Sequence, residues 1–387
     1  MKKPRIAILA MLRGGIGHYI AQLSPHLAED YDIEYISYKF GLPGDEVTLD
    51  DPAIAKHIKN KPLFGIAYNS YNETTKSIGD VVDFLKKKKI DVLNIHVGTI
   101  VRETAYVIIS IVSTAKKLGI KILYTFHDVE PFEKYAGGED FLRTLYQLAD
   151  GGTVGGEDER EKLIKKFGFN ADDLIIARHG IYSIFDFNKF DRASARRHLG
   201  IPEDKKVILN FGILRDYKGF DDTISAMPKI LSAHKNAFLH VSSGVRVWDN
   251  SHDLIKLAKR VGLGKNTIKL NFDFVPSSEI EPIFKASDVV VLPYKQVSQS
   301  GILNIALFFK KPVILSNLFL EADMVDRKMG LIIKPGKPDL IAQAVDKLLS
   351  DTSFYKQCEK NITAYLKKDI WKATAQNYNK IIKKILS

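Results

Sequence analysis

Short apolar runs alternate along the chain with longer segments in which apolar residues recur at helical spacing. In the first half, Arg5–Ala10 has the composition of a buried strand, and an amphipathic helix is predicted over residues 19–27. Further strands are predicted over 92–95 and 122–126, on either side of a helix over 103–118. The second half repeats the pattern with a helix over 221–234 and several apolar runs, at 207–211, 238–241, 268–272, 289–292 and 313–315.

Strands that alternate with helices predict parallel sheets covered by helices on both faces. Because the pattern starts twice, we expect an α/β protein of two Rossmann-like domains, with ligands at the carboxyl ends of the strands. The pattern lapses around residues 186–195, which places the expected domains at 1–188 and 189–368. A length of 387 residues also suits two cores better than one.

The composition is that of a soluble globular protein, with 45% hydrophobic and 27% charged residues. The apolar run after the first lysines ends at Arg13-Gly14-Gly15, too early for a signal peptide, and no stretch of about 18 apolar residues follows. A single cysteine, Cys358, excludes an internal disulfide and a cysteine-based metal cluster. We therefore expect a cytoplasmic protein.

The positive charge is confined to the second half of the chain. Up to Phe185 there are 24 Lys and Arg against 25 Asp and Glu, whereas the remainder has 33 against 21. The excess indicates a solvated basic surface, an anionic ligand or an anionic membrane surface. The lysine run 86–89 and the lysines near the C-terminus can likewise face either solvent or an anionic membrane surface. No basic segment interleaves with aromatic residues as a nucleic-acid groove requires, so no nucleic-acid partner is expected.

Two glycine-flanked loops are candidates for phosphate binding. In the first, Gly15 and Gly17 would let backbone N–H groups approach a phosphate, although a tight turn without a ligand explains them equally well. Ile20 occupies the place of the third glycine of a dinucleotide fingerprint, which disfavours a nicotinamide site. In the second loop, Gly212 permits a turn and two cations follow at a spacing of three, Arg215 and Lys218. Such a pair can clamp a diphosphate, unless it forms only an exposed basic turn.

Two histidines and one elbow between a strand and a helix are the remaining candidates for functional residues. His127 and His179 each follow an apolar run, where a hydrogen-bonded structural histidine is the simpler explanation. The elbow Ser298-Gln299-Ser300-Gly301 joins a predicted strand to a helical segment, a place that favours anion binding by backbone N–H groups. No acidic residue occurs between Val291 and Leu315.

Taken together, these segments resemble retaining glycosyltransferases of the GT-B type, specifically glycosyltransferase family four, also called the group 1 type. The resemblance covers almost the whole chain and includes several motifs: GGIG at 14–17, HDVEP at 127–131, HG at 179–180, FGILRDYKGFDD at 211–222, FDFVPSSEIEPIFKASDVVVLPY at 272–294, SQSG at 298–301 and KPVILSN at 311–317. It implies two domains that face each other across a deep cleft. It also implies that a terminal helix, residues 369–387, crosses back to the first domain.

The resemblance implies transfer of a sugar, of the hexosyl type, from a nucleoside-diphosphate sugar to a glycan or lipid-linked acceptor with retention of configuration. We expect a UDP- or GDP-sugar donor, no other cofactor, no metal and, at most, peripheral contact with the inner membrane face. Arg215 and Lys218 match the diphosphate-binding pair, and His127 matches the histidine that contacts the donor sugar. The matching binding positions are Gly15, Gly17 and Gly212, Phe274 and Val275 for the base, and Ser298, Gln299, Ser300, Gly301 and Ile302 for the distal phosphate.

The chain departs from the family where most members carry two glutamates eight residues apart, one for the sugar and one for the ribose. One alignment register places Val297 and Ile305 there, and the next places Gln296 and Asn304. We favour Gln296 and Asn304, whose amides can form hydrogen bonds. The departure leaves a catalytically silent homologue that stabilises or recruits a partner as the alternative. An epimerase or phosphorylase would need an acidic cluster or a cofactor-binding lysine that the sequence does not indicate.

Overall fold

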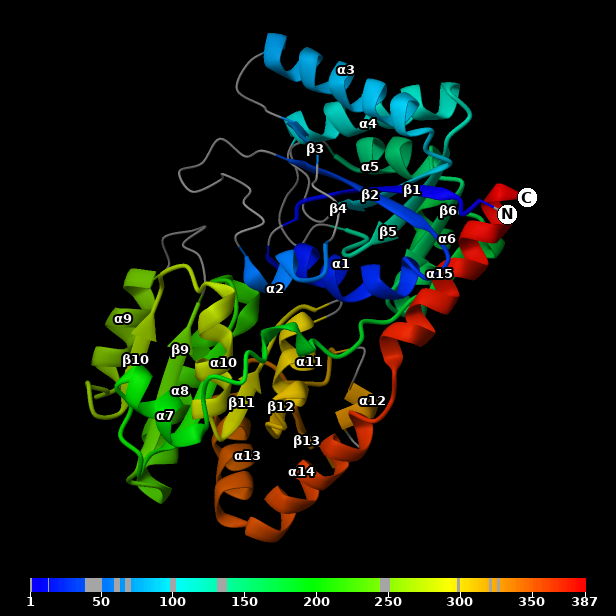
Figure 1. Cartoon of the computed structure of the whole chain (residues 1–387). Coiled ribbons are helices and arrows are strands. Elements are labelled where there is room, and N and C mark those ends of the chain that lie inside the picture. Colours follow the sequence, from blue (N-terminus) through cyan, green and yellow to red (C-terminus); the bar gives the residue numbers. More distant parts are fainter. Residues whose placement is uncertain are drawn as a thin grey trace. The chain divides into compact units, whose positions relative to one another are not determined.

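The computed structural model describes residues 2–12, 14–38, 51–58, 63–66, 71–97, 102–130, 138–243, 251–297, 300–319, 322–325 and 328–387. The chain forms two compact units (Figure 1). Unit 1 comprises Met1–Gly180 and Asp369–Ser387, and unit 2 comprises Ile181–Lys368. The join expected at 188/189 therefore falls within unit 2. Among the described residues, no helix is both long and apolar enough to cross a membrane.

Unit 1 alternates strands and helices in the predicted manner. Its strands are β1 (Arg5–Ala10), β2 (Asp32–Tyr38), β3 (Leu63–Ile66), β4 (Val92–Val97), β5 (Lys121–Phe126), β6 (Gly151–Val154) and β7 (Leu174–Ile176). Its helices are α1 (Gly14–Leu27), α2 (Pro52–Ala55), α3 (Tyr71–Lys88), α4 (Arg102–Lys117), α5 (Gly138–Gln147), α6 (Glu157–Phe167), the 3₁₀ turn η1 (Ala171–Asp173) and α15 (Ile370–Leu386). The strands form one parallel sheet in the order β3-β2-β1-β4-β5-β6-β7.

Unit 2 repeats this architecture. Its strands are β8 (Lys206–Phe211), β9 (Ala237–Ser242), β10 (Ile268–Asn271), β11 (Val289–Leu292), β12 (Val313–Ser316) and β13 (Gly330–Ile333). Its helices are α7 (Arg192–Leu199), α8 (Phe220–Ala233), α9 (Ser251–Arg260), α10 (Ser277–Ala286), α11 (Gly301–Phe308), α12 (Ala322–Val325), α13 (Pro338–Ser350) and α14 (Thr352–Tyr365), with the 3₁₀ turns η2 (Ser183–Phe185) and η3 (Asp216–Lys218). The sheet is parallel in the order β10-β9-β8-β11-β12-β13.

The two sheets confirm the predicted α/β fold of two Rossmann-like units. A parallel strand covered on both faces has to be apolar on both faces, and β11, Val289–Leu292, is buried at every residue. In each sheet the strand order reverses at one point, between β1 and β4 in unit 1 and between β8 and β11 in unit 2. Loops at the carboxyl ends of such strand pairs form the usual ligand-binding position of this architecture.

The apolar runs, with the run before His179 that forms β7, leave four strands unpredicted, β2, β3, β6 and β13. They also place the start of the first helix too late. Helix α1 begins at Gly14 rather than at residue 19, so the predicted glycine turn is its first turn. Gly17 is required there by close packing, because a Cβ on it would lie 2.7 Å from the carbonyl carbon of Leu12.

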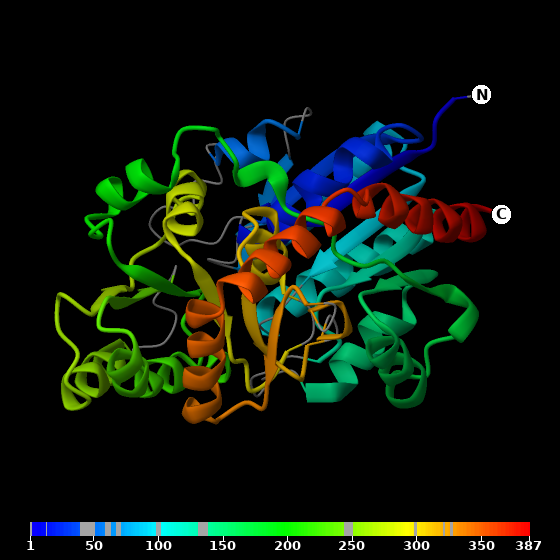
Figure 2. The same ribbon diagram turned by 90° about the horizontal axis from the view of Figure 1, so that it is seen from below.

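The last helix, α15, belongs to unit 1, where it lies along α1 (Figures 1 and 2). The buried hydroxyl of Tyr378 lies 2.8 Å from Thr125 Oγ1 on β5 and 3.1 Å from the hydroxyl of Tyr19 on α1, and it accepts from Thr153 Oγ1 on β6. The side chain of Thr374 donates to the carbonyl of Arg178 at 2.6 Å. These bonds fix the helix against three elements that are distant from it in the sequence.

Close packing of α15 also explains two glycines of unit 1. A Cβ on Gly151 would lie 3.0 Å from Ile381 and from Ile385 of this helix. A Cβ on Gly180 would lie 2.5 Å from the ring of Trp371. The helix can approach this closely only where the opposing residues have no side chain.

We predict that Gly180→Ala lowers the stability of unit 1 by about 1–3 kcal/mol, the usual cost of overpacking a filled site. Gly79→Ala is the matched control, because Gly79 lies within helix α3 with no atom near its missing Cβ. That substitution should leave stability unchanged or raise it by up to about 1 kcal/mol through helix propensity. Calorimetric melting of both variants tests the packing, and equal melting of Gly180→Ala and the wild type would contradict it.

Candidate functional site

The loops that follow β8 and β11 carry the strongest site candidates, and the two strands are neighbours in the sheet of unit 2. The loop after β8 contains Gly212, Arg215 and Lys218, and the loop after β11 leads into the start of helix α11 at Gly301. Since both strands are parallel, the two loops leave the same edge of the sheet at its switch point. The fold therefore brings together two of the motifs that the sequence singles out.

Lys218 is held by an aromatic residue from the neighbouring loop. Its ammonium donates to the hydroxyl of Tyr294 at 3.0 Å and lies 4.3 Å from the centroid of the same ring. Burial raises the pKa of Tyr294, so this hydroxyl stays neutral. The ammonium is thus fixed by a hydrogen bond and a cation–π contact while its positive charge remains uncompensated by Tyr294.

The glycines on either side of this loop have separate physical roles. Gly212 has φ +135°, and a Cβ on it would lie 3.3 Å from the ammonium of Lys218. Gly219 has φ +67°, and a Cβ on it would lie 2.7 Å from the carbonyl oxygen of Pro293. Both positions combine a backbone conformation that favours glycine with a lack of space, so any side chain would displace Lys218 or separate the two loops.

Arg215 lies on the same turn as Lys218. The backbone N–H of Lys218 donates to the carbonyl of Arg215 at 3.0 Å and closes the short 3₁₀ turn η3. Arg215 is the extended residue that precedes the turn and Lys218 is its last residue, so the turn brings the backbones of the two cationic residues together.

The elbow before α11 presents the amino terminus of a helix. Ser300 caps the helix by accepting from the backbone N–H of Leu303 at 3.4 Å, and Gly301 and half-exposed Ile302 form its first residues. The positive end of the helix dipole lies here. Ser298 and Gln299 of the predicted site lie outside the described residues.

The two amide side chains proposed in place of the family glutamates differ in environment. Gln296 is exposed, whereas Asn304 is only 1% exposed, within helix α11. The amide nitrogen of Asn304 donates to the carbonyl of Ser300 at 3.4 Å, and its Oδ1 has no hydrogen-bond partner among the residues that the structure describes. An unsatisfied buried oxygen is costly unless a further donor reaches it.

The residues predicted for the nucleotide base lie farther along the same edge. Phe274, 53% exposed, and half-buried Val275 follow β10, which is separated from β8 by β9. An exposed aromatic ring is a suitable surface for stacking a planar base.

His127 lies in unit 1, where β5 ends, in a cluster of aromatic and imidazole rings. The ring of Tyr19 lies 5.1 Å from His127 and 4.7 Å from His179, measured between centroids. Burial lowers the pKa of His127 to about 4 and that of His179 to about 3. Both imidazoles are therefore neutral at physiological pH.

A chain of hydrogen bonds assigns the proton of His127 to one ring nitrogen. Thr125 Oγ1 donates to Oδ1 of Asn94, which leaves the Asn94 amide to donate to Nε2 of His96 at 2.9 Å. Since burial keeps His96 neutral, its proton lies on Nδ1, which then donates to Nε2 of His127 at 3.2 Å. The remaining proton of His127 consequently lies on Nδ1.

Several partners of the candidate residues in the two units are not evident from the sequence, although some signals are present. Asn94 and His96 occupy one face of β4, at the two-residue period of a strand, and polar residues in an otherwise apolar strand could have indicated them. Tyr294 lies 76 positions from Lys218, and only the strand order of the sheet makes them neighbours.

The predicted phosphate-binding residue Gly15 is exposed in the first turn of α1. Within the described part of the chain, no group of three His, Cys, Asp or Glu residues could hold a metal ion.

Comparison with known proteins gives matches for both halves of the chain. Residues 13–182 match the model of "Glycosyltransferase Family 4", and residues 191–365 match "Glycosyl transferases group 1". An uncharacterized glycosyltransferase of Methanocaldococcus jannaschii is 30% identical over 217 residues, 55% of this chain. The chain spans only about half of that relative, 53%, and 61% of the putative glycosyltransferase YtcC of Bacillus subtilis.

A D-inositol 3-phosphate glycosyltransferase of Corynebacterium diphtheriae is 23% identical and matches 95% of this chain and 89% of its own length. Among solved structures, Anabaena HepE in complex with UDP-glucose has a TM-score of 0.75 at 16% identity and covers 98% of this chain and 99% of its own. A glycosyltransferase of Rickettsia africae has a TM-score of 0.74 at 15% identity, with full coverage of both chains. Because the two family models match the two halves in chain order, and the fold is that of these structures, this chain belongs to the group 1 glycosyltransferases of family four, with a GT-B fold.

Proposed function

We propose that this protein transfers a sugar from a nucleoside-diphosphate sugar, of the UDP or GDP class, to a glycan or lipid-linked acceptor. The observation that carries the proposal is the placement of Lys218 and Arg215 on one turn at the switch point of unit 2. The family supports it, as does the presence of UDP-glucose in the similar HepE structure. We propose a cytoplasmic location, where basic surface would also allow peripheral contact with an anionic membrane face.

The two cations suit the charge change of this reaction. When the bond between the sugar and the diphosphate breaks, negative charge develops on the leaving diphosphate. Charges that are already fixed in position stabilise such a state more than charges that must first reorganise. Tyr294 fixes the ammonium of Lys218 in this way, and the start of α11 adds backbone N–H groups and a helix dipole of the same sign.

We propose that transfer occurs with retention of the anomeric configuration and without a protein nucleophile or metal ion. The acceptor hydroxyl attacks the anomeric carbon from the face that the diphosphate leaves. As the new carbon–oxygen bond forms and the old one breaks, the hydroxyl proton passes to a phosphate oxygen of the leaving group. His127 would contact the donor sugar as a neutral imidazole.

Asn304 and Gln296 would replace the two family glutamates as hydrogen-bonding groups. The buried Oδ1 of Asn304, without a partner in the described part of the structure, could accept from a ribose hydroxyl. A neutral amide forms a weaker bond than a carboxylate, so donor affinity should be modest. The lack of any acid from Val291 to Leu315 also favours the second candidate function, a catalytically silent homologue that binds a partner.

Removing either cation tests the proposed chemistry. We predict that Lys218→Ala and Arg215→Ala each lower turnover by at least about a hundredfold, the scale for losing one preorganised charge partner. Lys229→Ala is the control, because this lysine lies on α8 with a largely exposed side chain. Steady-state rates with the identified donor provide the measurement. Turnover near the wild-type value in both site variants would rule out the assignment.

The imidazole cluster generates a separate prediction. His127→Ala should lower turnover by about a hundredfold, the scale for one hydrogen-bond donor at the reacting group, yet leave nucleoside-diphosphate affinity unchanged. Burial lowers the pKa of His127 to about 4. The pH profile of the wild-type rate should therefore show no change near pH 6.5 that depends on His127. Activity that depends on the neutral imidazole should decline only as the pH falls through about 4. A step near pH 6.5 that disappears in His127→Ala would contradict this role.

A further inference from the structure

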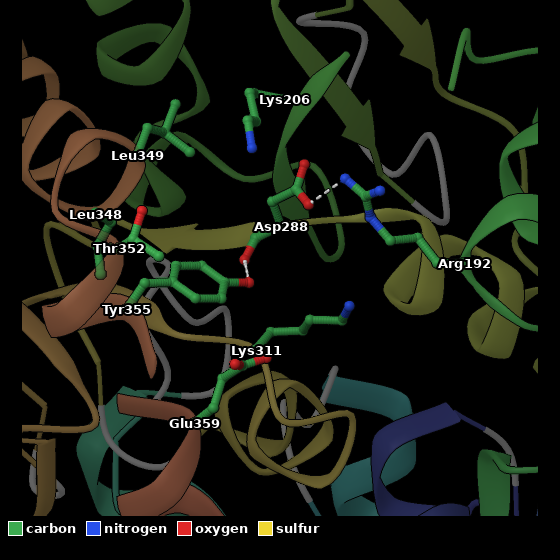
Figure 3. A pocket seen from close by; sticks show the side chains of 9 residues that line it. All are labelled: Arg192, Lys206, Asp288, Lys311, Leu348, Leu349, Thr352, Tyr355 and Glu359. Atoms are coloured by element: carbon green, nitrogen blue, oxygen red, sulfur yellow. Dashed lines mark hydrogen bonds and ion pairs between the residues drawn. The ribbon is translucent and has the colours of Figure 1, made fainter. Parts of the chain in front are cut away.

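A cationic cavity lies in unit 2, at the edge of the sheet opposite to the edge that carries Lys218. The cavity has a volume of about 300 Å³ (Figure 3). Lys206 is the first residue of β8, Asp288 immediately precedes β11, and Lys311 lies just before β12. Parallel strands all begin at the same edge, so these residues gather where the strands start, whereas the loops of the candidate donor site gather where the strands end.

Among the described residues, two carboxylates line the cavity, and they do not balance its cations. Asp288 is fully engaged, because its Oδ1 accepts from Arg192 at 2.8 Å and its Oδ2 accepts from buried Arg196 at 2.8 Å and from the backbone N–H of Val207 at 2.7 Å. The other lining carboxylate belongs to Glu359 on α14.

Three cations line the cavity, at Arg192, Lys206 and Lys311, against two carboxylates, which leaves an excess of one positive charge. The ammonium of Lys206 takes part in no hydrogen bond or ion pair with any residue that the structure describes. Its side chain points into the cavity in Figure 3.

Lys311 is the least exposed of the three cations that line the cavity. Its ammonium donates to the carbonyls of Ser287 at 2.7 Å and Lys285 at 3.3 Å, both near the end of helix α10. Burial lowers the pKa of Lys311 to about 8; Asp288 and Glu359 raise it, and Arg192 and Arg196 lower it. A role limited to capping α10 would explain Lys311 alone, but not the convergence of Arg192 and Lys206 on the same space.

The remaining walls indicate the class of ligand. Leu348 and Leu349 of α13 form an apolar side, and Thr352 lies in the first turn of α14. The hydroxyl of Tyr355 donates to the carbonyl of Asp288 at 2.9 Å, so its oxygen is available to accept from a ligand hydroxyl. A volume of about 300 Å³ is at the lower end of the range for small-molecule sites.

We infer that this cavity binds a small phosphate monoester, whose anionic group lies among the three lining cations and whose organic part lies against the leucines. Arg192 offers the planar fork that suits a phosphate, and Lys206 and Lys311 supply point charges. The site is separate from the proposed donor site and does not depend on it.

Titration calorimetry on the whole chain tests the inference, with glucose 6-phosphate and inorganic phosphate as probes at pH 8. We expect one glucose 6-phosphate per chain, bound at least tenfold more tightly than inorganic phosphate. Comparison of two phosphate-free buffers with different ionisation enthalpies should show net proton uptake, since the bound dianion raises the pKa of Lys311. Equal affinity for the two probes, or no proton uptake, would overturn the assignment of a monoester beside Lys311.

Variants distinguish this cavity from other sites. Lys206→Met should weaken glucose 6-phosphate binding at least tenfold, and because Lys206 is exposed the variant should fold normally. Lys229→Met, on the exposed surface of α8, and Lys218→Ala, at the opposite edge of the sheet, should bind this probe as the wild type does. Unchanged binding by Lys206→Met, or equal loss in Lys218→Ala, would show that the probe binds elsewhere.

Discussion

The contact between the ammonium of Lys218 and Tyr294 is the interaction on which the candidate site depends. It joins the loops of two adjacent parallel strands, β8 and β11, and its geometry requires that no side chain be present at Gly212. A free lysine side chain samples many rotamers and loses that freedom on binding, whereas this one is already oriented. The fold thus provides a fixed positive charge at the position where a parallel sheet reverses its strand order.

The sequence predicts the elements with the simplest patterns and misses those that depend on tertiary contact. Strands β1 and β11 are continuous apolar runs and were located at their observed bounds. Strand β6 begins with two glycines, and Gly151 is glycine because α15 packs against it. Strand β2 alternates polar and apolar residues and includes two acids, so it lacks the apolar run of a buried strand.

The same distinction holds for the site. Arg215 and Lys218 could be found because their cooperation is local, within one turn of backbone. The hydrogen-bond chain from Asn94 through His96 to His127 could not, since it joins the ends of two strands whose pairing is set by the sheet. The excess of basic residues in the second half has two structural correlates in unit 2, at opposite edges of one sheet: the turn with Lys218 and the cavity with Lys311.

We propose that the turn with Lys218 and the start of α11 bind the diphosphate of a nucleotide. Calorimetric titration of the wild type with UDP, GDP and the corresponding nucleosides tests it most directly. The account predicts that one of the two diphosphates binds at a single site at least about a hundredfold more tightly than its nucleoside, the difference expected for two charged hydrogen-bonding partners. Equal affinity of nucleoside and diphosphate, or no binding of either diphosphate, would contradict it.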